Sequence, residues 1–138
     1  MLFGDWVDPR PDARRRYQSR VSKTDADGNE VGGIRLPDIA VPLATYTGWN
    51  LYQAPFPDGE LCDRDDLYKA FAVTRAERAG AGEPRPSLQE RYAGPADYAH
   101  RVTVRASELV RQRLLLQEDA EAHALQAQRL AQGVFSVK

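Results

Sequence analysis

The stretch DADGNEVGGIRLPDIAVPLATYTGWNL, residues 25–51, decides the fold of this chain. It opens with a turn sequence, continues as a short extended run, and becomes a proline-punctuated segment with several aromatic residues. In the turn, Asp25 can bond its own backbone and Gly28 tolerates a positive φ. Apolar residues occupy short extended runs on both sides: Val21, Val31, Ile34 and Leu36. The pattern predicts a β-hairpin over residues 18–36.

The middle of the chain, residues 37–86, is expected to be mostly irregular. Each proline lacks an N–H donor and restricts the residue before it, which excludes long helices and central strands. These prolines are Pro37, Pro42, Pro55, Pro57, Pro84 and Pro86. A short helix fits residues 71–79, because Gly80 and Gly82 follow it. Such a long irregular stretch normally wraps a core supplied by other elements, or forms a functional loop.

Residues 87–133 are expected to be helical. Ser87 and Glu90 make a capping box for a short helix, and Pro95 suits the first position of a longer one that runs to about Arg113. The longer helix carries an apolar stripe: Tyr98, Val102, Ala106, Leu109 and Val110. A last helix spans about 118–132, with one face of small residues: Ala120, Ala124, Ala127 and Ala131. These two helices predict a helical hairpin.

The expected fold class is α+β, in one region that covers residues 1–138. An irregular segment at 1–17 precedes the hairpin, and the irregular middle and the helices follow. Apolar residues make up 42% of the chain, and many of them are alanines that bury little area. We therefore expect a thin core that depends partly on a neighbouring surface.

The charge balance argues against nucleic acid and membrane as partners. Nineteen basic and twenty acidic side chains give a net charge of −1, and Arg14, Arg15 and Arg16 form the only basic cluster. No apolar run approaches the roughly 20 residues that span a bilayer, and the amino terminus has no signal-peptide core. A cytoplasmic location is the default expectation, unless an upstream signal has been lost.

No residue in the sequence stands out as catalytic. None of the serines lies in G-x-S-x-G, and Ser87 is explained as a helix cap. His100 and His123 fall in the middle of predicted helices, where packing explains them better than general-base chemistry. The glycines complete neither a phosphate-binding loop nor a dinucleotide fingerprint, so no cofactor is expected.

No metal site is expected either. Cys62 is the only cysteine, and the two histidines are too far apart for a zinc motif. The turn superficially follows a calcium loop, but glycine falls at the fourth position and Leu36 at the twelfth.

The loop from Thr45 to Asn50 is the best candidate for a binding site. Aromatic rings supply contact area and polar tips fix orientation, so one interpretation assigns a ligand-binding role to Tyr46, Thr47, Trp49 and Asn50. The alternative is that Tyr46 and Trp49 anchor this loop onto the core, with Gly48 permitting close backbone approach. Both readings stay open.

The string over residues 25–51 resembles the carboxy-terminal region of bacterial alpha/beta hydrolase domain-containing proteins. Their pattern reads D-x-D-G-N-E, then GIRLP, then VPLATYTGWN. Downstream, AVTRAERAGAGEPRPSLQERY and LLLQEDAEA are similar to the same family's linker and to the corner between its last two helices, although Gln117 stands where proline is frequent. The resemblance covers roughly residues 20–131. It implies part of an α/β-hydrolase-type protein whose ester-hydrolysing serine, acid and histidine lie upstream of this stretch.

Two functional hypotheses follow. In the first, the chain is the C-terminal portion of such a hydrolase, structural or pocket-lining and not catalytic by itself. Its partner would be a hydrolase core domain, or a second copy of the chain. In the second, the chain is a free-standing, non-enzymatic module that binds a protein or a small ligand. The first predicts an exposed apolar face in the isolated chain, and the second a closed core with cooperative unfolding.

Overall fold

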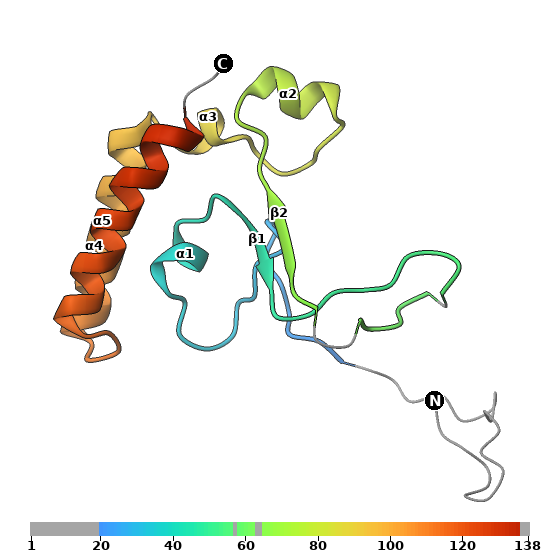
Figure 1. Ribbon diagram of the computed structural model, residues 1–138, viewed down its shortest axis with the longest axis horizontal. Coiled ribbons are helices and arrows are strands. Elements are labelled where there is room, and N and C mark those ends of the chain that lie inside the picture. Colours follow the sequence, from blue (N-terminus) through green and yellow to red (C-terminus); the bar gives the residue numbers. More distant parts are fainter. Residues whose placement is uncertain (1–19, 57, 63–64, 136–138) are drawn as a thin grey trace, which may run out of the picture.

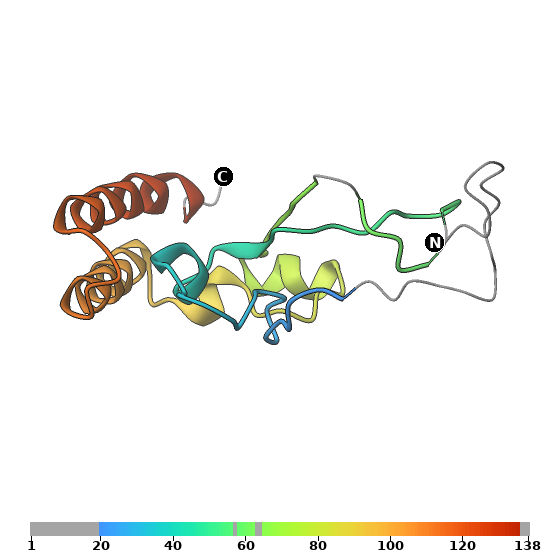
Figure 2. The same ribbon diagram turned by 90° about the horizontal axis from the view of Figure 1, so that it is seen from below.

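The computed structural model describes residues 20–56, 58–62 and 65–135. It is an α+β structure in which helices outnumber strands (Figure 1). The elements, in chain order, are α1 (Pro37–Ala40), β1 (Ala44–Thr47), β2 (Leu67–Ala70), α2 (Arg75–Gly80), α3 (Leu88–Arg91), α4 (Pro95–Arg111) and α5 (Gln117–Val134). Helices α4 and α5 lie side by side at one end, and the segment between β1 and β2 extends from the other (Figure 2).

The turn at residues 25–28 forms as predicted, but the described part of the β-hairpin expected over residues 18–36 is reduced to one bridge. Residues 18 and 19, like the segment 1–17, lie outside the described residues. The Asp25 carboxylate accepts the N–H groups of Asp27 and Asn29, both at 3.0 Å, and Gly28 has φ +80°. Among the described residues, the pairing beside this turn is a single antiparallel bridge between Thr24 and Glu30. Gly33, at φ +72°, bends the chain soon after it and prevents a longer return strand.

The sheet lies instead in the segment expected to be mostly irregular. Strands β1 and β2 pair antiparallel, with Tyr46 opposite Tyr68. Each strand has only four residues, so both fit between the prolines. Helix α1 was also not expected; it forms because Pro37 stands at its start, where a missing N–H does no harm.

The helix expected at 71–79 begins later, at Arg75. Phe71 is still in extended chain, and its N–H donates to the Leu43 carbonyl at 3.1 Å. Thr74 then caps α2 by accepting the Glu77 N–H, while Glu77 accepts the Thr74 N–H in return. This reciprocal cap sets the start of α2 more strongly than the apolar residues before it.

The C-terminal helical hairpin is confirmed. Helix α4 begins at Pro95, and α3 carries the Ser87–Glu90 capping box. Helix α5 runs one residue past Gly133, which was expected to lie beyond its end. The facing surfaces are those that the periodicity indicated. Buried residues are Tyr98, Val102, Ala106 and Leu109 on α4, and Ala120, Ala127 and Ala131 on α5.

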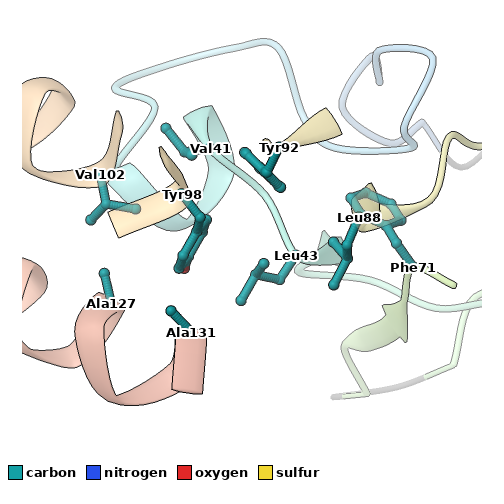
Figure 3. Close-up of a cluster of buried hydrophobic side chains, with 9 residues drawn as sticks. All are labelled: Val41, Leu43, Phe71, Leu88, Tyr92, Tyr98, Val102, Ala127 and Ala131. Carbon is teal, nitrogen blue, oxygen red and sulfur yellow. The ribbon is translucent and has the colours of Figure 1, made fainter. Parts of the chain in front are cut away.

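One small apolar cluster joins the helices to the sheet (Figure 3). The Tyr92 ring packs edge-on against Tyr98, with ring centroids 5.3 Å apart, and its hydroxyl donates to the Pro42 carbonyl at 2.8 Å. The cluster consists of Val41, Leu43, Phe71, Leu88, Tyr92, Tyr98, Val102, Ala127 and Ala131. Within the described part of the chain, no helix is long and apolar enough to cross a membrane.

Candidate ligand-binding site

Asn29 fixes the turn against the sheet. Its side chain is fully buried; its amide donates to the Ala44 carbonyl at 3.0 Å, and its carbonyl accepts the Tyr46 N–H at 2.7 Å. These are the hydrogen bonds that a neighbouring strand would make, so the Asn29 side chain takes the place of a strand beside β1. Thr45 strengthens the junction by donating its hydroxyl to the Asp27 carbonyl.

Ion pairs hold the same junction from the helical side. Arg91 bonds both carboxylate oxygens of Asp27, and Arg85 bonds Glu83 and the Thr45 hydroxyl. The hydrogen bonds from Arg85 hold the pKa of Glu83 far below its usual range. Both guanidinium groups also lie over the Phe71 ring, at 5.0 Å for Arg85 and 4.1 Å for Arg91. The turn, β1 and α3 are thereby fastened together.

A half-open cavity of about 440 Å³ lies beside the sheet. The rings of Tyr46 and Tyr68 form one wall, with centroids 5.4 Å apart and planes tilted by 59°. Loop 30–35, α1 and the ends of both strands supply the rest of the lining. It consists of Glu30, Gly32, Ile34, Arg35, Ile39, Tyr46, Thr47, Gly48, Asp66, Leu67 and Tyr68.

Arg35 closes the base of this cavity. Its Nη2 donates to the Asp25 carboxylate at 2.7 Å and to the Ile39 carbonyl at 2.9 Å. Arg105 of α4 donates to the Arg35 backbone carbonyl at 2.8 Å, which anchors loop 30–35 to the helices. The Arg35 Nε is buried and bonds to none of the described residues.

Tyr46 presents a hydroxyl that stays protonated at neutral pH. Burial raises its pKa to about 12, and the neighbouring Tyr68 and Asp38 act in the same direction. With two aromatic rings, Ile34 and Ile39 around it, the cavity suits an apolar or aromatic group that also accepts a hydrogen bond.

The structure separates the four residues that the sequence singled out. Tyr46 and Thr47 line the cavity, whereas Trp49 and Asn50 lie outside its lining. Asn50 bonds locally, accepting the Leu51 N–H at 2.8 Å through its side chain and the Cys62 N–H at 2.9 Å through its backbone. Trp49 accepts the Thr47 hydroxyl at 2.6 Å through its carbonyl.

Sequence reasoning missed Tyr68, Ile34 and Arg35. Tyr68 faces Tyr46 only because of the register between two strands that are far apart in the chain. No local pattern in residues 67–70 marks it out. The segment around Ile34 and Arg35 was assigned to a hairpin strand, and that assignment hid its role as a cavity wall.

A second cavity, of about 400 Å³, lies between the turn and the start of α4. Its charged side chains largely satisfy each other: Arg35 pairs with Asp25, and Arg91 with Asp27. Tyr92 and Pro42, which line it, are joined by their own hydrogen bond. This cavity is part of the structural network that positions the turn.

A family model described as an alpha/beta hydrolase domain matches residues 4–124 of the chain. The chain belongs to this family. The match covers the turn, both strands, α1 to α4 and the first part of α5. It confirms the family that the string over residues 25–51 had suggested. Curated proteins and solved structures give no match to the chain.

The side chains that ester hydrolysis would need do not meet in the described part of this hydrolase-family chain. The buried Ser87 donates its hydroxyl to Glu90 at 2.7 Å, and Ser107 donates to the Thr103 carbonyl. His100 is exposed on α4. His123 lies 3.7 Å from the Asp38 carboxylate, beyond hydrogen-bonding range. No described serine is hydrogen-bonded to a histidine.

Protein groups surround the acidic residues of the turn. Asp25 accepts two backbone N–H groups and pairs with Arg35, and Asp27 pairs with Arg91. In the described ranges, no three histidine, cysteine or carboxylate side chains gather in a way that could hold a metal ion.

Proposed function

We propose that this chain is a non-catalytic, C-terminal portion of an alpha/beta hydrolase domain protein. In this proposal it packs against a catalytic core and contributes the wall of Tyr46 and Tyr68 to a binding pocket. The observation that carries it is that the cavity opens among exposed apolar side chains. Ile34 and Tyr68 line it and are 54% and 67% exposed, and Val31 and Leu36, also exposed, lie close to Ile34 in the chain. Exposed apolar groups around a concave site are typical of a surface that another body covers.

A projecting arm, described at residues 50–56 and 58–62, supports the same proposal (Figures 1 and 2). A single bridge between Leu51 and Leu61 holds its base. Tyr52 and Phe56 stack on each other with centroids 4.4 Å apart, and both are exposed. An aromatic pair that stays exposed removes little apolar surface from water, so it adds little to the stability of this chain. We therefore assign the arm to contact with the catalytic core.

The first test is hydrolysis of an aryl ester, p-nitrophenyl acetate, by the purified chain. We expect no turnover above that of Ser87→Ala, because the Ser87 hydroxyl is already bonded to Glu90. Turnover that Ser87→Ala abolishes would make the chain an enzyme and end the proposal.

The second test measures the exposed apolar surface with the fluorescent dye anilinonaphthalene sulfonate. We expect the folded chain to bind the dye, and Ile34→Ser to weaken that binding severalfold. Leu116→Ser is the matched control, because Leu116 is exposed at the corner between α4 and α5, away from the cavity. Equal effects of both substitutions would argue against an apolar docking surface at the cavity.

A free-standing binding module is the second candidate. It is favoured by the apolar cluster that joins the helices to the sheet, in which Leu88 is almost inaccessible to solvent, and by Leu109 of α4, which is equally buried. This candidate predicts that dye binding is absent and that urea unfolding is cooperative. In that case, tryptophan fluorescence and circular dichroism would give the same transition.

A further inference from the structure

The two edges of the small sheet differ. In an antiparallel pair, residues alternate between pointing their N–H and C=O groups at the partner strand and away from it. The Phe71 N–H donates to the Leu43 carbonyl, and Tyr46 bonds Asn29 on the far side of β1. It follows from the register that Tyr68 and Ala70 point their backbone groups outward from β2.

The outer edge of β1 is partly occupied, and the chain just beyond β2 is paired. The Asn29 side chain takes two of the four outward groups there, the Ala44 carbonyl and the Tyr46 N–H. Past β2, the Ala72 carbonyl accepts the Leu88 N–H at 2.9 Å. Between these contacts, the outward N–H and C=O groups of Tyr68 and Ala70 bond to none of the described residues, and both residues are exposed.

The side chains along this edge add a charge and an apolar face. Lys69, with a side chain 61% exposed, lies 3.1 Å from Glu83, but Glu83 is already bonded twice by Arg85. Two cations therefore share one carboxylate, which leaves this face of β2 positive. Tyr68 lies on the opposite face, beside Tyr46 and the cavity.

We propose that the open edge of β2 binds an extended strand of another polypeptide. The strand would carry an acidic residue opposite Lys69 and apolar residues opposite Tyr68 and Ala70. Its main chain pairs with the four outward backbone groups, and one apolar side chain covers Tyr68 at the mouth of the cavity. The inference rests on the proposed packing of this chain against a catalytic core, and it names the edge and the kind of segment involved.

A second copy of this chain fits the edge poorly. The antiparallel register that uses both outward residues of each copy places two Lys69 side chains directly opposite each other. Like charges at such a position are destabilising, and an exposed edge lysine is a common device against self-pairing. The occupant is therefore a strand of different sequence.

The test uses two blocked peptides, acetyl-Thr-Ile-Glu-Ile-Thr-amide and the same peptide with lysine in place of glutamate. Amide hydrogen exchange of the full chain is followed by NMR at increasing peptide concentration. We expect the glutamate peptide to slow exchange at the Tyr68 and Ala70 amides at least tenfold at saturation. We expect it to bind at least threefold more tightly than the lysine peptide.

Two variants separate edge pairing from other modes of binding. Ala70→Pro removes an outward donor but leaves the hydrogen bonds to β1, and proline is tolerated on edge strands. It should abolish protection at Tyr68, whereas Ala70→Val, which keeps the donor, should not. Lys69→Gln should make the two peptides bind equally, and this result decides the matter if Ala70→Pro fails to fold.

Unchanged exchange at Tyr68 and Ala70 at the highest peptide concentration would overturn the inference. Equal binding of both peptides to the unmodified chain would do the same. Neither result bears on the ester and dye tests, so the docking proposal stands or falls separately.

Discussion

At Gly28 the backbone of the turn lies close against Thr45 of β1. The Gly28 φ of +80° lies in the left-handed region, and a Cβ built there would be 2.8 Å from Cγ2 of Thr45. Gly33 has a similar φ of +72°, yet a Cβ there meets nothing within 4 Å. The two glycines therefore differ in steric contact while sharing the same backbone conformation.

We predict that Gly28→Ala destabilises the chain by more than Gly33→Ala. The left-handed conformation costs an alanine about 1–2 kcal/mol at either position. Only at residue 28 does the new methyl group also displace Thr45 and strain its bond to Asp27. Urea denaturation of both variants measures the difference. Equal losses would show that the turn can move away from β1 without penalty.

The local sequence was enough to predict the turn, but not the hydrogen bonds that the turn makes to β1. Asp25 and Gly28 act on their immediate neighbours, and a turn of this kind is recognisable from four residues. Asn29 acts on Ala44 and Tyr46, which lie on a separate element. Its fully buried amide could be assigned a role only after the position of β1 was known.

At the scale of elements, the contact between α4 and α5 depends on small side chains. Ala127 and Ala131 are buried on α5 against α4, whereas Ala122 is exposed on the other side of the same helix. Alanines at such a contact let two helices approach closely.

We predict that Ala127→Leu destabilises the helical hairpin by about 1–3 kcal/mol, the usual range for overpacking a close contact. Ala122→Leu makes the same exchange in the same helix, so the change in helix propensity is equal, but the site is exposed. It should change stability by less than about 0.5 kcal/mol. Thermal unfolding followed by circular dichroism compares the two variants. A neutral Ala127→Leu would mean that α5 does not pack through its alanine face.

The sequence indicated the helices well and the strands poorly. Helical period, Pro95 and the Ser87–Glu90 cap are local signals, and α3, α4 and α5 follow them. Strands β1 and β2 have four residues each, too few for a clear alternation, and a long arm separates them. A bend at Gly33 likewise left only one bridge of the expected hairpin.

At the scale of the whole molecule, the arm at residues 50–62 stands apart from the core. Its aromatic pair, Tyr52 and Phe56, packs on itself, and no arm residue belongs to the apolar cluster. The candidate cavity lies near the root of the arm, because Gly48, which lines the cavity, comes two residues before the arm.

We predict that replacing residues 51–61 with Gly-Asn-Gly leaves the stability of the remaining structure unchanged or raises it by a few tenths of a kcal/mol. A shorter connection between paired strands loses less entropy on closure. Urea denaturation gives the stability, and the circular dichroism of the helices serves as the control for folding. A loss of more than about 1 kcal/mol in the free energy of unfolding would show that the arm contributes to the packing of this chain.

The candidate site was half predictable. Tyr46 and Thr47 carry a recognisable aromatic and polar pattern, and both reach the cavity. Trp49 and Asn50 share that pattern but lie beyond the end of β1 at Thr47, where the chain leads into the arm. Tyr68 lies on the partner strand, and it faces Tyr46 only because of the register between β1 and β2.

The buried Asn29 amide has a consequence for assembly. A sheet with two free sides can propagate from molecule to molecule into a fibre, whereas one with a single free side is saturated after one addition. Because the Asn29 amide already bonds the Ala44 carbonyl and the Tyr46 N–H, a strand added on the β1 side would lack these two hydrogen bonds, which disfavours growth of the sheet in that direction.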